Sequence, residues 1–494
     1  MSARGLLIDS GAEPAEPWAS IEHFEPGEPH TAVTTLASVA ALGGFLFGYD
    51  SAVINGAVTA IGAHYHTAAG TLGFAVASAL LGAAAGALAA GRVADSLGRR
   101  WAMRIAAVLF LVSAVGTALA SSLAMLIVFR VIGGVGVGVA SVIAPAYIAE
   151  IAPARIRGRL GSLQQLAIVL GIFAALLIDY VLETVAGGSE KNLAAGLAAW
   201  RWMFLAMTVP AIIYGIGAFL IPESPRYLVA KGRLEEAGEV LRRVLGNIDI
   251  AGKLREIQRT IAREVKPTIR DLRGPALGLL PIVWVGIGLS VFQQFVGINV
   301  IFYYSSVLWQ AVGFSESSSL IITVITSVVN IVTTLIAMSR IDRSGRRPLL
   351  IIGSIGMTVT LGAMALIFGT APLNAHGEPV LNGAAGPIAL ISANLFVFAF
   401  GMSWGPVVWV ILGEKFPNRI RAAALSVAAA AQWVANWAIS TSFPVLKNAG
   451  LGLAYGIYAV SALLSLFFVL RFVSETKGKE LEEMTEDVHV TGLA

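Results

Sequence analysis

Two oppositely charged side chains lie inside apolar stretches of this sequence, where they could bind and release a proton. Asp50 is the only charged residue between Thr31 and Thr59, and Arg130 lies in another apolar stretch. A charge at the centre of a bilayer costs about 2.5–3.5 kcal/mol even on the lenient insertion scale, so it needs a partner, a water-filled cavity or a function. A carboxylate that makes and loses a contact with an arginine changes its proton affinity. The two residues are therefore a candidate proton-coupling pair.

The other polar groups in the apolar stretches are predicted to be amides and aromatic rings rather than charges. Amides both donate and accept hydrogen bonds, which suits hydroxyl groups, and flat rings suit the apolar face of a pyranose. Hydrogen bonding between helices is the alternative role for any single amide. A cavity lined in this way favours a neutral polyol over an anion. The polar groups are Gln164, Gln165, Gln293, Gln294, Asn299, Tyr303, Tyr304, Asn330, Trp404, Trp409, Gln432, Trp433 and Asn436.

The elements that position these residues must be membrane helices. Of 494 residues, 56% are hydrophobic and 13% charged, whereas about 25% are charged in soluble domains. Cysteine is absent, which excludes disulfides, thiolate nucleophiles and zinc–sulfur sites. The net charge of +4 does not indicate nucleic-acid binding, because the arginines lie between hydrophobic stretches. The two close histidines, His64 and His66, lack the further ligands of a metal site.

Hydrophobic stretches of about 20 residues predict about twelve membrane helices and an all-α fold. We place them near residues 31–58, 72–94, 101–120, 123–150, 159–182, 202–222, 275–308, 318–340, 347–370, 388–413, 422–446 and 450–472. The resulting domains are a disordered cytoplasmic tail (1–30), a six-helix bundle (31–222), a helical linker (223–274), a second six-helix bundle (275–472) and a tail (473–494). Glycine and proline predict hinges at Gly288, Gly297, Gly405, Pro406 and Pro444.

The distribution of lysine and arginine predicts the orientation. These residues gather in the loops after spans two, four, eight and ten and in the linker, and cytoplasmic loops retain them. Both termini are therefore expected in the cytoplasm. With span one running outward and span four inward, Asp50 and Arg130 lie at a similar depth, roughly 10–14 Å at 1.5 Å per residue. The alternative to proton coupling is that Asp50 and Arg130 form an ion pair that only holds two helices together. Buried ion pairs are, however, weak evidence for a stabilising role.

The two halves repeat a charged pattern, which indicates a duplicated six-span unit. Asp95 to Arg100 after span two matches Asp342 to Arg347 after span eight, and the ends of spans four and ten also match. Acids and arginines in these loops can pair and lock one conformation. The predicted cytoplasmic gate residues are Asp95, Arg99, Glu150, Arg157, Asp342, Arg346, Glu414 and Arg421.

Several motifs together resemble the sugar porter family of the major facilitator superfamily, over essentially all of residues 43–478. The matching stretches are 44–50, 91–100, 130–134, 222–228, 293–304 and 475–478, with Ser474 where the family usually has proline. The resemblance implies twelve helices in two pseudo-symmetric bundles with cytoplasmic helices between them. Bacterial proton-coupled members resemble this chain in the aspartate at position 50. Ile172 is similar to the isoleucine of glucose-transporting relatives, which favours glucose or a similar hexose.

The resemblance also implies where a sugar binds. It assigns sugar contacts to Gln165, Gln293, Gln294, Asn299, Asn330, Trp409 and Gln432. Phe47 and Trp433 would line the site, and Tyr303 would close it from outside.

The sequence therefore predicts a sugar:proton symporter that works by alternating access, as a monomer, in the bacterial inner membrane. Protonating Asp50 would loosen its tie to Arg130 before the two halves rock. No cofactor, metal or nucleic acid is expected; the proton gradient supplies the driving force. A facilitative uniporter and a non-transporting sugar sensor stay open as alternatives. An enzyme is not expected, because no constellation of nucleophile, base and metal is present.

Overall fold

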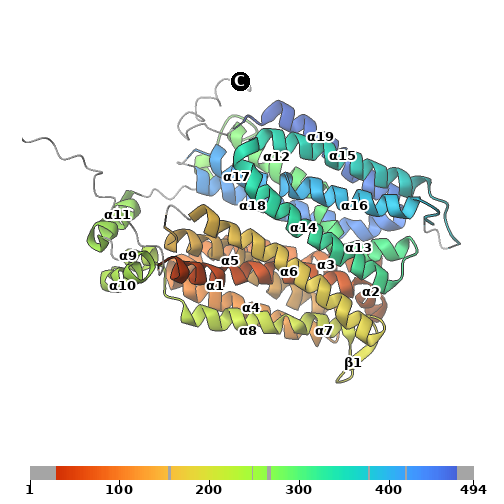
Figure 1. Cartoon of the computed structure of the whole chain (residues 1–494), viewed down its shortest axis with the longest axis horizontal. Coiled ribbons are helices and arrows are strands. Elements are labelled where there is room, and N and C mark those ends of the chain that lie inside the picture. Colours follow the sequence, from red (N-terminus) through yellow and green to blue (C-terminus); the bar gives the residue numbers. More distant parts are fainter. Residues whose placement is uncertain are drawn as a thin grey trace, which may run out of the picture.

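Helices make up nearly all the regular structure of the computed structural model, which describes residues 29–153, 157–246, 249–263, 269–375, 379–417 and 420–475 (Figure 1). The first half contains α1 (Pro29–Ala52), α2 (Ile54–Tyr65), α3 (Ala69–Leu97), α4 (Arg99–Ala118), α5 (Leu123–Ile151), α6 (Arg157–Ala186), α7 (Ala199–Ala206) and α8 (Thr208–Leu220). A small antiparallel hairpin, β1 (Asn192–Ala194) and β2 (Leu197–Ala198), joins α6 to α7.

The second half has the same number of main helical segments. It contains α12 (Pro281–Phe295), α13 (Ile298–Ala311), α14 (Glu316–Ser344), α15 (Arg346–Thr370), α16 (Ala385–Gly401), α17 (Trp404–Lys415), α18 (Arg421–Ala449) and α19 (Leu451–Phe472). Between the halves lie α9 (Pro225–Ala230), α10 (Leu234–Leu245), α11 (Ile250–Arg263) and the 3₁₀ turn η1 (Ile269–Leu272). Figure 1 shows α9, α10 and α11 gathered at one end of the long axis.

In the described residues, eleven helices or broken helix pairs are long and apolar enough to cross a membrane. The twelfth spanning helix is α18, 29 residues long, which carries polar Gln432, Asn436 and Ser440 in its middle. The predicted twelve-helix architecture in two bundles is thus confirmed.

Several spans are broken near the middle. One break lies at Val53 between α1 and α2, another at Gly297 (φ +81°) between α12 and α13, and a third at Ser403 between α16 and α17. Gly288 and Pro444 lie inside the continuous helices α12 and α18, so the hinges predicted there are wrong. The break at Gly297 needs glycine, because that positive φ is costly for other residues.

Glycines bring α3 and α5 into close backbone contact. A Cβ atom on Gly134 would lie 1.9 Å from the carbonyl oxygen of Ala79, and one on Gly82 would lie 2.1 Å from that of Val131. Small residues at a helix crossing allow such an approach, which compensates for the weak hydrophobic driving force between helices in lipid. This crossing fixes the part of α5 that carries Arg130.

The two ends of the bundle differ in charge, and we name them accordingly. The Arg-rich end holds the α3–α4 and α14–α15 turns, with Arg99, Arg100, Arg346 and Arg347. The Arg-poor end holds the α2–α3 turn and the β1–β2 hairpin (Figure 1).

Candidate functional site

Asp50 and Arg130 meet inside the first half. The Arg130 Nη1 atom lies 3.3 Å from Asp50 Oδ1 and donates to the Asp50 backbone oxygen at 3.1 Å. Asp50 is 1% exposed and Arg130 2% exposed. The bond to the backbone oxygen does not depend on the charge of the carboxylate, so Arg130 keeps one contact with α1 when that charge is lost.

The pair is only partly satisfied. In the described part of the chain, Asp50 Oδ2 and Arg130 Nε have no hydrogen-bond partner. Beside them lies a cavity of about 10 Å³, lined by Asp50, Ser51 and Arg130 and also by Tyr303 of the second half. This is about the space that one water needs. The second half therefore contributes directly to the surroundings of the ion pair.

Three predicted sugar-binding amides come together at the break between α12 and α13. Asn299 Nδ2 donates to Gln294 Oε1 at 2.5 Å, and Gln294 Nε2 donates to Gln293 Oε1 at 3.4 Å. Gln293 Nε2 in turn donates to the carbonyl oxygens of Trp404 at 2.9 Å and Gly405 at 3.1 Å. Broken helices at membrane depth need such partners for their freed backbone groups. The amide cluster thus ties one broken span to another.

Two further predicted residues meet across the halves. The rings of Phe47 and Trp433 lie 6.0 Å apart between centroids and are tilted by 44°. Tyr303 is 6% exposed, and its hydroxyl interacts with the side chains of Ser51 and Asn436. Tyr303 on α13 lines the same cavity as Asp50 and Arg130, so it lies close to the ion pair.

The remaining predicted contacts are more dispersed. Gln165 is exposed, Trp409 is 42% exposed, and Asn330 and Gln432 are half-buried. Among the described residues, no hydrogen bond joins these four side chains to the amide cluster. The neighbouring Gln164 is 8% exposed and packs against Gly44 instead.

One expectation about the membrane interior is wrong. Asp179 and Glu183 on α6 are buried acidic residues, with exposures of 0% and 5%, so the intramembrane polarity is not limited to amides and rings. Asp179 falls inside the predicted span 159–182, so its acidic type was a readable signal. Burial depends on the face of α6 that packs against α1, which the sequence alone does not give.

The predicted gate charges pair within each half at the Arg-rich end. Arg99 Nη2 lies 2.8 Å from Glu150 Oε1, and its Nη1 lies 3.7 Å from Asp95 Oδ1. In the second half, Arg346 Nη2 lies 2.8 Å from Glu414 Oε1. The side chains of three other predicted gate residues, Arg157, Asp342 and Arg421, lie outside the described part of the structure.

Two glutamates that the sequence analysis did not select repeat this symmetry. Glu223 accepts hydrogen bonds from the backbone nitrogens of Arg99 at 2.9 Å and Arg100 at 3.2 Å. Glu475 accepts from those of Arg346 and Arg347, both at 3.0 Å. Each carboxylate thus caps the N-terminus of the helix after a glycine turn, where the helix dipole favours a negative charge. Their matching places after the sixth and twelfth spans were a usable signal.

The Arg-poor end holds the two halves together. Asn55 Nδ2 on α2 donates to the Phe302 oxygen on α13 at 2.9 Å, and Asn55 Oδ1 accepts from the Ser306 nitrogen at 3.1 Å. Ser189 beside α7 donates to the Glu316 carboxylate on α14. A Cβ atom on Gly73 would lie 2.2 Å from the oxygen of Thr441. We call these contacts the Arg-poor gate, and it is closed in this structure.

Replacing Asn55 with alanine is expected to loosen the Arg-poor gate. The variant loses two side-chain hydrogen bonds between the halves, about 1–2 kcal/mol, which shifts the open-to-closed ratio roughly tenfold. The chain contains no cysteine, so spin labels attach only to cysteines introduced at Leu119 and Leu373, exposed residues of the two halves at this end. Pulsed electron paramagnetic resonance then reports the distance between the halves.

A matched variant controls for the loss of an asparagine. Asn394 Nδ2 bonds to the Leu390 oxygen within α16, away from the gate, so Asn394→Ala should leave the distance distribution unchanged. An Asn55→Ala protein with the same distribution as the parent would show that Asn55 does not hold the gate.

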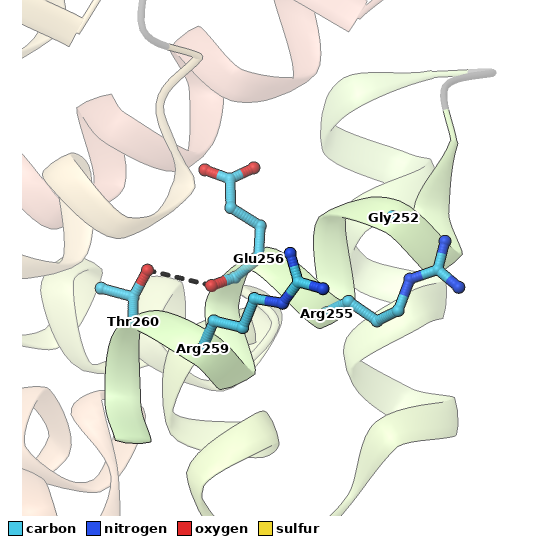
Figure 2. A pocket seen from close by; sticks show the side chains of 5 residues that line it. All are labelled: Gly252, Arg255, Glu256, Arg259 and Thr260. Atoms are coloured by element: carbon cyan, nitrogen blue, oxygen red, sulfur yellow. Dashed lines mark hydrogen bonds between the residues drawn. The ribbon is translucent and has the colours of Figure 1, made fainter. Parts of the chain in front are cut away.

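The linker presents a separate hollow of about 550 Å³, lined by Gly252, Arg255, Glu256, Arg259 and Thr260. Figure 2 shows these side chains along one helix, α11, with the Thr260 hydroxyl bonded to the Glu256 oxygen. Because a single surface helix supplies every lining group, the hollow lacks the convergent buried groups of a binding site. Among the described residues, no cluster of three His, Cys, Asp or Glu side chains could hold a metal ion.

Comparisons with known proteins agree with this architecture. A family profile described as "Sugar (and other) transporter" matches residues 36–488. The chain is 59% identical over 454 residues to the "Glucose transport protein" of Synechocystis sp., covering 92% of this chain and 97% of that protein. It is 39% identical over 485 residues to the "D-xylose-proton symporter" of Escherichia coli, covering 92% and 95%.

Solved structures of sugar transporters share this fold over nearly the whole chain. The inward open conformation of the xylose transporter XylE from E. coli gives a TM-score of 0.78 at 36% identity, covering 92% of this chain and 99% of that one. The same proton:xylose symporter bound to 6-bromo-6-deoxy-D-glucose gives a TM-score of 0.73 at 36% identity, covering 93% and 99%.

Proposed function

Since this chain belongs to the sugar porter family of the major facilitator superfamily, we propose that it imports a monosaccharide together with a proton. The buried pair of Asp50 and Arg130 carries the proposal. Arg130 is the one fully buried basic side chain in the described part of the chain. Protonating Asp50 removes the charge that attracts Arg130, so proton binding changes the contact between α1 and α5.

Alternating access links that change to the sugar. The Arg-rich end faces the cytoplasm, because basic loops stay on that side, and both termini lie there too. The closed Arg-poor gate is then the outer gate. In the outward-facing state the predicted gate residues, from Asp95 to Arg421, hold the inner side shut. A ligand shifts this equilibrium only through its different affinity for the two states.

The sugar binds where the broken spans of the second half face the first half. Gln293, Gln294 and Asn299 would offer donors and acceptors to sugar hydroxyls, and the rings of Phe47 and Trp433 would line the site. Gln165, Asn330, Trp409 and Gln432 complete the contacts, and Tyr303 separates the sugar from the outer side. A neutral, amide-rich site of this kind matches a sugar better than an anion.

Replacing Gln294 with alanine is expected to raise the KM for sugar about tenfold or more. Gln294 both donates and accepts within the amide cluster, and a polar site that loses a hydrogen bond to its substrate loses about 1–3 kcal/mol. The concentration dependence of labelled-sugar uptake measures this. Gln310→Ala, at the far end of α13, serves as the matched control; an unchanged KM in Gln294→Ala would remove Gln294 from the site.

The transported sugar is glucose or a similar hexose. Relatives named for glucose and for xylose both resemble the chain, and Ile172 on α6 favours glucose. Competition of unlabelled glucose, xylose and galactose against labelled glucose decides between them. Uptake of labelled xylose without any uptake of labelled glucose would overturn this assignment.

The family is one of transporters, so we assign no enzymatic activity. The protein acts as a monomer in the bacterial inner membrane, without a cofactor, and its working parts are bundles 31–222 and 275–472, joined by the linker 223–274. Uptake into proteoliposomes tests the function. Labelled glucose should accumulate when the outside is made acidic, and a protonophore should abolish the accumulation. Equilibration without accumulation would indicate a uniporter, and binding without entry a sensor.

A further inference from the structure

Asp179 is a buried acid that the proposed transport cycle does not use. It lies on α6, is 0% exposed, and its Oδ2 accepts a hydrogen bond from the Gly56 nitrogen on α2 at 3.1 Å. Within the described residues its Oδ1 has no partner. Gly56 leaves room for this contact, since a Cβ atom there would lie 2.7 Å from the Asp179 side chain. The carboxyl group is thus held by one backbone amide.

No positive charge stabilises this carboxyl group among the described residues. On α1, Tyr49 is close enough to interact electrostatically, but it donates to the Met203 oxygen at 3.1 Å. The other titratable and charged groups on elements packed against α6, or on α6 itself, are engaged elsewhere or lie nearer the end of the bundle. Toward the Arg-poor end they are His64, Tyr65 and Arg201, which cluster, and Glu183 and Glu316, which lie near Ser317 and Ser189. Asp50 pairs with Arg130, and Tyr180 follows Asp179 on α6. Toward the Arg-rich end Glu150 pairs with Arg99, Tyr147 donates to the Pro222 oxygen, and Arg340 is exposed.

A lone buried carboxyl group is stable only in its neutral form. An isolated ionised carboxylate in an apolar interior is very costly, and the group binds a proton instead. One backbone hydrogen bond does not replace the hydration of a full charge. The structure therefore holds Asp179 as a protonated acid while its surroundings stay closed.

Asp179 is also linked to the Arg-poor gate. Its hydrogen-bond donor, Gly56, directly follows Asn55, which bonds to α13 of the second half. Because both residues lie in the first turn of α2, any motion of α2 that opens the gate also changes the surroundings of Asp179. Water then reaches the carboxyl group and stabilises its ionised form.

We propose that Asp179 is a proton-binding site that controls the Arg-poor gate. The gate closes when Asp179 takes a proton from the outer medium, and it opens as Asp179 returns that proton to the same medium. The proton is not among those delivered with sugar. This proposal rests on the proposed orientation and alternating access, but not on sugar as the substrate.

The test is the distance between spin labels at Leu119 and Leu373, measured against pH without sugar. The measurement is made in an Asp50→Asn background, so that Asp50 does not titrate. Raising the pH should increase the open-to-closed ratio by up to about tenfold per pH unit, the slope for one proton. Adding Asp179→Asn should hold the open-to-closed ratio at its low-pH value at every pH, because asparagine stays neutral and still accepts from the Gly56 nitrogen; the gate still opens, but no longer in response to pH. An undiminished pH dependence in that variant would overturn the proposal.

Two further measurements guard against a folding defect and against the alternative that the proton is transported. In the Asp50→Asn protein alone, an infrared band of a protonated carboxyl group should disappear at the pH where the gate opens; its absence while the gate is closed would contradict the proposal. The number of protons carried per sugar should be the same in Asp179→Asn and in the parent. A decrease by one would show that Asp179 carries a transported proton instead. Since the distance experiment contains no sugar, a failure of the sugar assignment leaves it unaffected.

Discussion

Replacing Asp50 with asparagine is expected to abolish the accumulation of sugar against a gradient and to leave the exchange of sugar across the membrane intact. Asparagine carries no charge and takes no proton, so the contact with Arg130 no longer depends on the proton gradient. The Arg130 bond to the backbone oxygen at position 50 does not need the carboxylate, so we expect the variant to fold. Uphill uptake of labelled glucose and counterflow, measured in the same proteoliposomes, separate the two activities.

The expected size of this effect is complete loss of accumulation, with counterflow within about a few-fold of the parent. Glu256→Gln on α11 is the control for removing one acid, because its side chain is 63% exposed and far from the pair. If Asp50→Asn protein still concentrated sugar under a proton gradient, the buried pair would be structural, and another group would couple the proton.

Replacing Gly134 with valine is expected to prevent the first half from folding. A Cβ atom there would lie 1.9 Å from the oxygen of Ala79, and this neighbour is backbone, which cannot rotate away. Forcing α3 and α5 apart disrupts the crossing beside Arg130, at a cost of about 3 kcal/mol or more by comparison with overpacked cores. Folded yield and the thermal unfolding temperature in detergent measure the loss.

Gly91→Ala on α3 is the matched glycine variant. Its Cβ meets nothing within 4 Å, and alanine is the better helix former by about 1 kcal/mol, so this protein should unfold at the same or a higher temperature. A monodisperse Gly134→Val protein with the unfolding temperature of its parent would show that the α3–α5 crossing can widen without loss.

The sequence predicted the features that depend on hydrophobic length and on paired charges. Stretches of about 20 apolar residues predicted the spans, and their alternation with basic loops is enough to set Asp50 and Arg130 at the same depth. The repeated charged loops also form equivalent ion pairs, as Arg99 with Glu150 and Arg346 with Glu414. These features are local patterns that a bilayer constrains strongly.

Features that depend on which side of a helix is buried were not predicted. Glu223 can act as a cap only because the end of α8 lies beside the α3–α4 turn. In the same way, Glu475 can act as a cap only because the end of α19 lies beside the α14–α15 turn. Asp179 was overlooked because its burial follows from the packing of α6 against α1 and α2. Gly288 and Pro444 were expected to break their spans, yet the surrounding helices continue through them. The closed Arg-poor gate likewise depends on contacts between residues far apart in sequence, such as Asn55 and Ser306.

The most direct test of proton coupling is the pH of the outer medium when sugar enters. Proteoliposomes containing the protein are suspended in a weakly buffered solution, and glucose is added without any imposed gradient. Symport predicts that the outer medium becomes alkaline as protons enter with the sugar, and that Asp50→Asn abolishes this change. Glucose uptake with no change in outer pH would contradict the account.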